Sequence, residues 1–233
     1  MSNRPFRAVV LTISDSAFRG EREDRSGPAA TEFLIGIGGD VVRSEILPDV
    51  RSVIADRLAT LADSFPQVRI LDIGGGLGVA HEPGDLPLIL ADLDAALLAV
   101  KALYPRFELW IEPGRYLVAE AGVLITRVTQ LKLKSGVRFL GVDAGMHTLL
   151  RPALYDAWHE VRNLSRSGEP DEGRWQVVGP ICESSDVLAR DRLLPRAQTG
   201  DVMLIANAGA YGASMASRYN SRLAPLEVFR EDL

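Results

Sequence analysis

Four closely spaced glycines follow a short apolar run and offer the backbone freedom that an anion site needs. Glycine tolerates left-handed backbone angles, so consecutive N–H groups can turn toward one phosphate or carboxylate. A plain tight turn is the alternative interpretation. The glycines are Gly74, Gly75, Gly76 and Gly78.

A second group, Glu112-Pro113-Gly114-Arg115, ends another apolar run. Strand ends are where α/β proteins place their sites. The Glu112 carboxylate could pair with a protonated ring nitrogen, and the Arg115 guanidinium could bind a phosphate or carboxylate through two parallel hydrogen bonds. Gly114 permits the tight turn between them. A surface salt bridge is the alternative for an isolated Glu and Arg.

Three further groups carry polar chemistry near the end of the chain. Arg151 and Tyr155 are four positions apart, so on one helical turn they would share a face and grip one carboxylate. Cys182 and Glu183 follow an apolar run and a Gly-Pro turn. A lone cysteine is more often a buried apolar residue, but the acidic neighbours and the loop setting favour an accessible thiol. Tyr211 lies among small residues and could present its hydroxyl to an anion.

Alternating strands and helices must position these polar groups. The first 64 residues predict strand, loop, helix, strand and helix, with strands at 7–14 and 40–49 and helices at 28–38 and 51–64. A strand then enters the glycines, a helix is expected over 86–103, and another strand ends at Arg115. From Tyr116 onward, apolar runs separated by Gly, Pro and charged residues predict a mostly antiparallel β region, with a polar loop at 165–174.

The composition narrows the class of function. A formal net charge of -5 gives no electrostatic reason to expect nucleic acid or an anionic membrane as partner. No apolar run reaches the roughly 18 residues of a membrane-spanning helix. The single cysteine cannot form an internal disulfide, which fits a reducing cytoplasm. We therefore expect a cytoplasmic protein that acts on a small molecule, and we predict no metal site.

In their order, these motifs resemble diaminopimelate decarboxylase, a pyridoxal-phosphate-dependent enzyme that converts meso-diaminopimelate to lysine. The resemblance covers roughly residues 65–233 and rests on the segments GGGLG, EPGRYLVAEAG, GVDAGMHTLLRPALYDAWHE, VVGPICESSD and GDVMLIANAGAYG. It implies a homodimer, because in this family the cysteine-bearing loop enters the site of the neighbouring subunit. The CES sequence favours diaminopimelate over diamine-forming relatives, which carry Asp after the cysteine.

The resemblance implies a role for each polar group. The implied cofactor-binding residues, with Glu112 facing the pyridine nitrogen, are Gly74, Gly75, Gly76, Gly78, Glu112, Gly114, Arg115 and Tyr211. The implied substrate-binding residues, an amino-acid substrate being expected, are Arg115, Arg151, Tyr155 and Glu183. Within that set Arg151 and Tyr155 hold the distal carboxylate and Glu183 reads the distal amino group. Cys182 is the implied catalytic proton donor.

One required residue has no counterpart. The family attaches pyridoxal phosphate to a lysine well before the glycine-rich turn, yet none of the 73 residues before Gly74 is a lysine. The chain's three lysines are Lys101, Lys132 and Lys134. The early histidine that stacks on the cofactor is also missing, since the first histidine is His81. We therefore expect these residues alone not to be a competent decarboxylase.

The beginning of the chain carries a different resemblance. Residues 7–62, through the TISDS turn, the EDRSGP loop and the ILPD segment, resemble the N-terminal half of the molybdopterin-binding family that includes molybdopterin adenylyltransferase. The implied pterin site consists of Ser14, Asp15, Asp24, Ser26, Gly27 and Asp49. The TGGTG phosphate loop of that family does not follow, so an α/β layer that binds no ligand is the alternative.

We therefore predict a partial α/β layer, a hybrid of two parent folds, followed by an antiparallel β domain of the decarboxylase type. The predicted domains are 1–64, 65–115 and 116–233. Three functional interpretations stay open: a decarboxylase-related protein, a molybdopterin- or nucleotide-binding module, and a dimerisation fragment without a ligand. A chain that folds poorly is a fourth.

Overall fold

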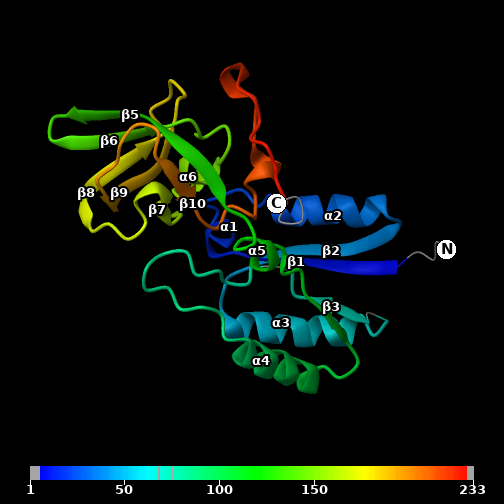
Figure 1. Cartoon of the computed structure of the whole chain (residues 1–233). Helices are drawn as coiled ribbons and strands as arrows, with labels where there is room; N and C mark the ends of the chain where they lie inside the picture. Colours follow the sequence, from blue (N-terminus) through cyan, green and yellow to red (C-terminus); the bar gives the residue numbers. More distant parts are fainter. Residues whose placement is uncertain (1–5, 68, 75, 230–233) are drawn as a thin grey trace. The chain divides into compact units, whose positions relative to one another are not determined.

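The computed structural model describes residues 6–67, 69–74 and 76–229, and its contacts divide the chain into two compact units (Figure 1). The first unit comprises Met1–Leu71 and Lys101–Leu109, and the second, the sheet unit, comprises Asp72–Val100 and Trp110–Leu233. The division passes through three elements, of which the two strands pair with each other: β3 (Ile70–Asp72), α4 (Leu90–Leu103) and β4 (Glu108–Trp110).

Two parallel strands form the centre of the first unit. Parallel neighbours require a crossover connection, and two helices lie in the segment that joins β1 to β2. The elements in chain order are β1 (Phe6–Ile13), α1 (Asp15–Phe18), α2 (Ser26–Gly36), β2 (Gly39–Leu47) and α3 (Arg51–Ser64). The strands and helices predicted for the first 64 residues are thus confirmed.

The sheet unit continues the chain from the glycine-rich turn. Its elements after α4 and β4 are α5 (Gly114–Val118), β5 (Leu124–Lys134), β6 (Val137–Val142), α6 (Arg151–Tyr155), β7 (Val161–Asn163), η1 (Leu164–Arg166), β8 (Asp171–Val178), β9 (Val187–Pro195), β10 (Val202–Ile205), η2 (Ala213–Met215) and η3 (Tyr219–Ser221). The segment after Tyr116 begins as helix rather than strand, because α5 extends through Val118 before β5 starts. The polar loop expected at 165–174 is shorter, since β8 already begins at Asp171.

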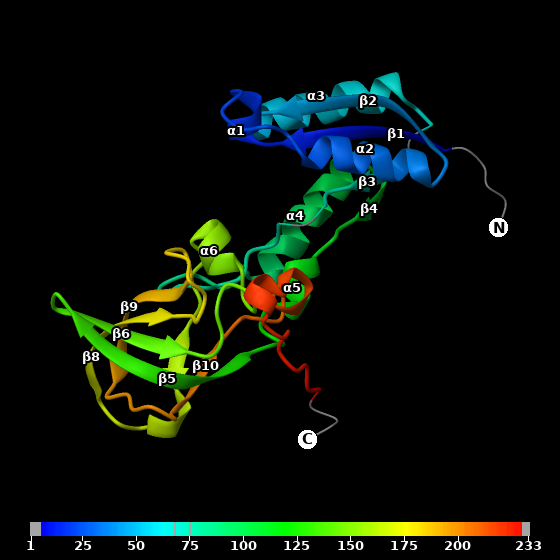
Figure 2. The same ribbon diagram turned by 90° about the horizontal axis from the view of Figure 1, so that it is seen from above.

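The six strands β7-β10-β5-β6-β8-β9 form one sheet (Figure 2). The expected antiparallel arrangement is wrong in one place: β6 and β8 pair parallel, with Arg138 opposite Trp175, so the sheet is mixed. A long connection through α6 and β7 separates these two strands and allows them to run in the same direction. The end strands β7 and β9 contact each other, so the sheet nearly closes on itself.

The core of the sheet unit lies inside this nearly closed sheet. In β5, β8 and β10 the buried residues alternate with more exposed ones, as the two-residue period of a strand requires. The cluster includes Val128, Leu140, Val142, Leu149, Trp175, Val177, Leu188, Met203 and Ile205. None of the described helices has the length and apolar character needed to span a membrane.

Candidate functional site

The glycine-rich turn follows β3 and lies beside the EPGR segment. The amide of Gly74 donates to the Asp72 carboxylate at 2.8 Å, and the carbonyl of Gly74 accepts from the Glu112 amide at 2.8 Å. Gly74 and Gly76 have positive φ angles of 75° and 86°, which a residue with a side chain rarely adopts. No atom lies within 4 Å of where a Cβ would be at Gly74, Gly76 or Gly78. The turn therefore leaves open space beside its backbone.

The structure brings the glycine-rich turn and the EPGR segment together. Gly75 lies outside the described residues. The Glu112 side chain is exposed, and the Glu112 carbonyl accepts from the Gly114 amide at 2.9 Å, which begins α5. Arg115 follows on α5 and is half-buried.

Arg151 is a charged side chain of the sheet unit that is almost completely buried. It is 7% exposed at the start of α6, and its Nη1 is buried with no hydrogen-bond partner among the described residues. Burial lowers the pKa of Arg151, and the nearby positive charge of Arg115 lowers it further. The Arg151 guanidinium lies 5.9 Å from the ring centre of Tyr211. A buried guanidinium with an unsatisfied N–H and a cationic neighbour is the setting in which an anionic group is favourable.

Tyr211 lies on a loop whose backbone is held by close contacts. Asn207 and Tyr211 both have positive φ angles, of 55° and 64°. A Cβ at Gly209 would lie 1.9 Å from the carbonyl oxygen of Val118, so only glycine lets this loop approach α5. Tyr155, one turn after Arg151, is exposed.

Two histidines beside this group were not predicted as site residues. The His159 side chain is fully buried, with Nδ1 2.9 Å from the carbonyl oxygen of Ala206. The rings of His81 and His159 are 6.2 Å apart, and the Nε2 atom of each is buried and unpartnered among the described residues. Burial lowers the pKa of both histidines, and the charge of Arg151 acts in the same direction. A single histidine has no spacing pattern that would have revealed this.

The loop with Cys182 and Glu183 is organised by Asp186, a second residue without a predicted role. The buried Asp186 carboxylate accepts from the amides of Met146 and Ile181, each at 2.6 Å. A Cβ at Gly179 would lie 2.3 Å from this carboxylate. Asp186 thereby joins the loop before α6 to the cysteine loop, and both Cys182 and Glu183 remain exposed.

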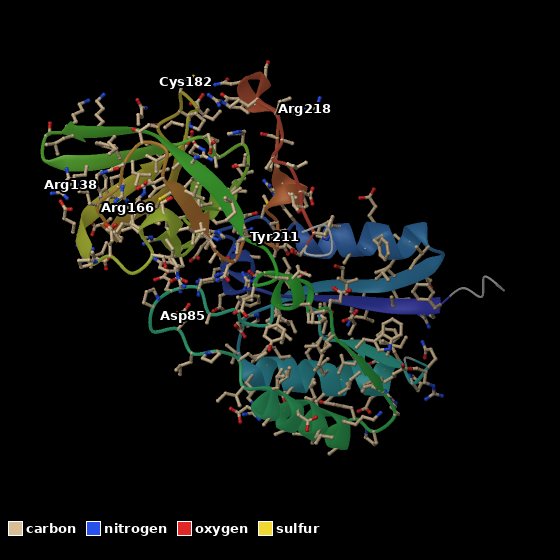
Figure 3. All side chains as sticks on the ribbon, in the orientation of Figure 1. Asp85, Arg138, Arg166, Cys182, Tyr211 and Arg218 are labelled. Atoms are coloured by element: carbon tan, nitrogen blue, oxygen red, sulfur yellow. The ribbon has the colours of Figure 1, made fainter. Side chains whose placement is uncertain are left out.

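Cys182 lies apart from the Arg151 and Tyr211 group. Figure 3 shows Cys182 and Tyr211 well separated within the sheet unit. The predicted residues therefore form two sets within one chain: Gly74, Gly76, Gly78, Glu112, Arg115, Arg151 and Tyr211 near β3, β4 and α6, and Cys182 with Glu183 elsewhere.

The predicted pterin residues lie after β1, near the start of α2 and after β2. The Ser14 hydroxyl accepts from the Ala17 amide at 3.3 Å and caps α1. The Asp15 carboxylate accepts from the Asp49 amide at 2.9 Å. Asp24 accepts from the amides of Ser26 and Gly27 at 3.0 and 3.1 Å. Burial raises the pKa of Asp24, but these hydrogen bonds and one from Thr12 outweigh it, so the pKa is lowered.

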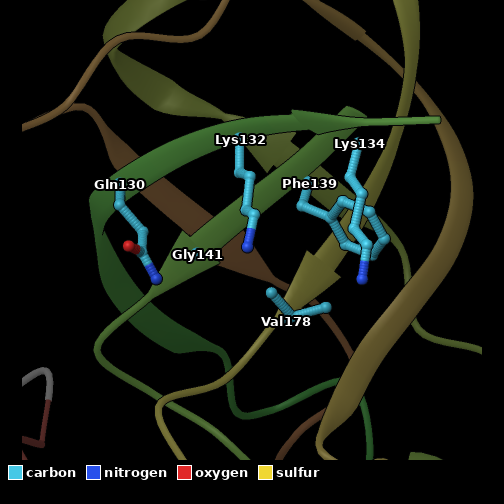
Figure 4. Close-up of a pocket in the computed structure, with 6 residues that line it drawn as sticks. All are labelled: Gln130, Lys132, Lys134, Phe139, Gly141 and Val178. Atoms are coloured by element: carbon cyan, nitrogen blue, oxygen red, sulfur yellow. The ribbon is translucent and has the colours of Figure 1, made fainter. Parts of the chain in front are cut away.

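One described cavity contains none of the predicted residues. It has a volume of about 250 Å³ and is lined by side chains of β5, β6 and β8 (Figure 4). The lining residues are Gln130, Lys132, Lys134, Phe139, Gly141 and Val178.

The family described as "Pyridoxal-dependent decarboxylase, C-terminal sheet domain" matches residues 15–209. The chain belongs to this family. The match begins within the segment that resembles molybdopterin-binding proteins, and it gives no support for a fused molybdopterin-binding domain or for a hybrid fold.

Relatives and solved structures agree with this assignment. Diaminopimelate decarboxylase of Methanothermobacter thermautotrophicus is 42% identical over 171 residues, which cover 70% of this chain and 39% of that protein. The structure of diaminopimelate decarboxylase from Helicobacter pylori complexed with L-lysine matches with a TM-score of 0.69 and 33% identity, covering 94% of this chain and 61% of that one. SrLDC in complex with PLP and cadaverine matches with a TM-score of 0.72 and 25% identity, covering 97% and 62%.

The chain spans 39 to 50% of the length of the curated relatives it matches. It is a diaminopimelate decarboxylase-related protein, and the cofactor of its family is pyridoxal phosphate. The residues present fit such a group in part: the turn at Gly74 and Gly76 leaves open space beside its backbone, and the positive charge of Arg115 near Arg151 favours an anionic molecule there.

Proposed function

We propose that this chain contributes the sheet-domain part of a pyridoxal-phosphate-dependent diaminopimelate decarboxylase, which forms lysine and carbon dioxide. The observation that carries the proposal is Arg151, a buried guanidinium with an unpartnered N–H beside the positive charge of Arg115. Without an anion these two cations repel each other and Arg151 loses a hydrogen bond. A cofactor phosphate or a substrate carboxylate would relieve both costs.

In the proposed site, each group near the glycine turn binds one end of a small anionic molecule. The amides around Gly74, Gly76 and Gly78 and the Arg115 guanidinium hold the phosphate. Glu112 accepts a hydrogen bond from the ring nitrogen and keeps it protonated, and Tyr211 closes the cofactor site. When bound, pyridoxal phosphate would supply an acceptor for the electron pair that remains as carbon dioxide leaves.

The substrate end uses the remaining residues. Arg151 and Tyr155 bind the distal carboxylate, and Glu183 accepts a hydrogen bond from the distal amino group. The Cys182 thiol transfers its proton to the carbon that has lost carbon dioxide, which forms the new C–H bond and leaves a thiolate. Because Cys182 lies apart from Tyr211 in one chain, we propose that Cys182 and Glu183 serve the site of a second copy, as a homodimer.

Binding of pyridoxal phosphate to residues 1–233 tests the proposal directly. We expect quenching of tryptophan fluorescence on titration with pyridoxal phosphate, and we expect Arg115→Ala to weaken binding about tenfold or more, since a guanidinium–phosphate pair contributes more than a neutral hydrogen bond. Arg174→Ala is the matched control, because Arg174 is exposed and pairs with Asp191. Equal affinity for Arg115→Ala and wild type would contradict the assignment.

Turnover is a separate part of the proposal. No lysine precedes Gly74 in these residues, so we propose that residues 1–233 alone do not release carbon dioxide from meso-diaminopimelate in the presence of pyridoxal phosphate. Carbon dioxide release above that of the free cofactor would refute this.

Sedimentation equilibrium tests the homodimer, and a concentration-independent monomer would exclude it.

A second candidate function uses the first unit. Ser14, Asp15 and Asp24 lie around α1 and the start of α2, and the Asp49 amide, after β2, donates to the Asp15 carboxylate. This arrangement supports a molybdopterin or nucleotide site as an alternative proposal. The same bonds also serve as helix caps and loop contacts. Calorimetry with molybdopterin or ATP, with Asp49→Ala as control, distinguishes the two: absence of heat from wild type ends this proposal.

A third alternative is a dimerisation fragment without a ligand. It predicts a stable dimer in which Arg151→Ala and Cys182→Ala change neither pyridoxal phosphate binding nor stability.

The proposed domains 1–64, 65–115 and 116–233 are best tested by limited proteolysis, which should cut near 64 and 115.

A further inference from the structure

A short segment after β10 lies against the loop that carries Cys182 and Glu183. The Tyr219 hydroxyl donates to Oε1 of Glu183 at 2.6 Å, and Nδ2 of Asn220 donates to Sγ of Cys182 at 3.4 Å. Two consecutive residues of one segment therefore contact two consecutive residues of the other. We call residues 217–221 the clasp.

The clasp is attached to the sheet unit by contacts of its own. The Ser217 amide donates to the carbonyl of His147 at 2.8 Å, and the His147 side chain is buried. The Tyr219 amide lies 3.4 Å from the Ser217 hydroxyl, and the Ser221 amide donates to the Arg218 carbonyl at 2.9 Å. The position of Tyr219 therefore does not depend on Glu183 alone.

The backbone of the clasp indicates that its shape is imposed by its contacts. Asn220 and Ser221 have φ angles of 54° and 58°, in the left-handed region. Non-glycine residues adopt this region uncommonly, and two in succession are rarer still. Such conformations persist where the surroundings over-determine them, which they do most often at functional sites.

The two contacts have different chemistry. The Tyr219–Glu183 bond is a short hydrogen bond to a carboxylate, the stronger kind. The bond to Glu183 and its negative charge raise the pKa of Tyr219, so the hydroxyl remains a donor at neutral pH. Among the described residues this bond occupies one carboxylate oxygen and leaves the other free for an amino group. The Asn220 amide fixes the direction of the sulfur.

We propose that Tyr219 and Asn220 are positioning residues that hold the Glu183 carboxylate and the Cys182 sulfur side by side, facing the distal amino group and the reacting carbon of an amino-acid substrate. The inference rests on the proposed function for the roles of Cys182 and Glu183. The family match ends at residue 209, so the clasp lies beyond it.

Alkylation of Cys182 tests the Asn220 contact, because this is the only cysteine in the chain. Asn220→Asp keeps the size of the side chain but replaces an N–H donor with a negative charge beside the sulfur. Since the thiolate is the reactive form, we expect alkylation by the neutral reagent iodoacetamide at pH 7.5 to slow about three- to tenfold. Gln198→Glu introduces the same charge at another exposed position of the sheet unit and should leave the rate unchanged. Equal rates for Asn220→Asp and wild type would overturn the Asn220 assignment.

The Tyr219 contact is tested by titrating tyrosines labelled with carbon-13 by NMR. Tyr219→Phe assigns one of the five tyrosine resonances, and in wild type this resonance should titrate above the ordinary value of about 10. Glu183→Gln removes the negative charge that disfavours tyrosinate, so the midpoint should move to lower pH. Glu172→Gln, on β8, is the control. A wild-type midpoint at the ordinary value, or no shift in Glu183→Gln, would overturn the Tyr219 assignment.

Neither experiment needs cofactor or turnover, so their outcome is independent of the proposed function. Failure to bind pyridoxal phosphate would leave a positive alkylation and NMR result standing. The wild-type titration also needs only the unaltered Glu183 and Tyr219, so a Glu183→Gln variant that fails to fold does not remove the test.

Discussion

The two units differ in how completely they bury their apolar side chains. In the sheet unit Leu140, Leu149, Val177, Met203 and Ile205 are fully buried, whereas the best buried apolar residue of the first unit, Phe107, keeps 5% exposure. On α2 of the first unit Phe33 and Ile35 are more than half exposed. Buried apolar area is the main favourable term in folding. We therefore expect the sheet unit to be the more stable of the two.

The distribution of aromatic residues lets the two units be followed separately. All three tryptophans, Trp110, Trp158 and Trp175, belong to the sheet unit. Of the three long helices, α2 and α3 belong to the first unit, and most of α4 belongs to the sheet unit. Tryptophan fluorescence thus reports unfolding of the sheet unit, and far-UV circular dichroism near the helix minimum is weighted toward the first unit.

Truncating one buried leucine in each unit should give the largest difference in stability between the two units. We expect Leu140→Ala in the sheet core to lower the free energy of unfolding by about 3 kcal/mol, because a fully buried leucine leaves a cavity when truncated. Leu61→Ala in α3 should cost roughly half as much, since its surroundings are open enough to relax. Denaturant unfolding followed by both signals measures the two values. Equal costs would show that the first unit is packed as well as the sheet.

Asp186→Asn should cause the next largest loss in the free energy of unfolding. The buried carboxylate accepts two backbone N–H groups, and an amide can accept at only one of its two ends, so about 2 kcal/mol should be lost. Hydrogen exchange should accelerate at 143–148 and 179–186 together, because Asp186 joins these loops. Asp191→Asn, at an exposed position, is the control. An effect confined to one loop would contradict the joining role.

Lowering the pH should destabilise only the sheet unit between pH 7 and 5. All three histidines, His81, His147 and His159, lie there, and burial lowers the pKa of each. Below about 6.5 the unfolded chain binds protons that the folded chain does not, so stability falls as the pH falls through this range, by at most about 1.4 kcal/mol per histidine and pH unit.

The first unit has no histidine, and its Asp24 and Glu45 have lowered pKa values, so its stability should fall only below about pH 5, where the unfolded carboxyl groups begin to bind protons. Unfolding at pH 7.5 and 5.5 by the two signals checks this. His159→Gln should make the fluorescence-detected slope shallower. A parallel loss in both signals would mean that the units unfold as one.

The smallest effect should come from the ion pair of the first unit. Glu45 on β2 pairs with Arg57 on α3 and with Arg43, and these side chains remain partly exposed. Glu45→Gln should therefore cost about 0.5–1 kcal/mol, less at high salt. Circular dichroism melts at low and high salt measure it. No salt dependence in wild type would show that the pair contributes nothing.

The sequence predicts local elements better than pairings. The helix at Arg51–Ser64 is found at its observed bounds because the spacing of its apolar residues is contained in the segment itself. β9 (Val187–Pro195) does not stand out as an apolar run because Arg190, Asp191 and Arg192 interrupt it. The parallel pairing of β6 with β8 depends on residues more than thirty positions apart, and no local pattern encodes it.

The same distinction between local patterns and distant contacts applies to the site residues. Glycine runs and the EPGR and RPALY segments are contiguous, so their positions can be read, and the structure places Gly74 against Glu112. The contributions of His159, Asp186 and Tyr219 arise from contacts 36 to 47 residues away or from burial. Single residues of common types carry no spacing signal for such contacts.

The position of β10 has a consequence for synthesis of the protein. β10 (Val202–Ile205) is the last strand to be made, yet it lies between β7 and β5. Until it leaves the ribosome, β5 and β7 each present an unpaired edge to the surrounding solution, and open edges invite pairing with other chains. Aggregation of the nascent chain should therefore fall once β10 has emerged from the ribosome and has paired with both edges.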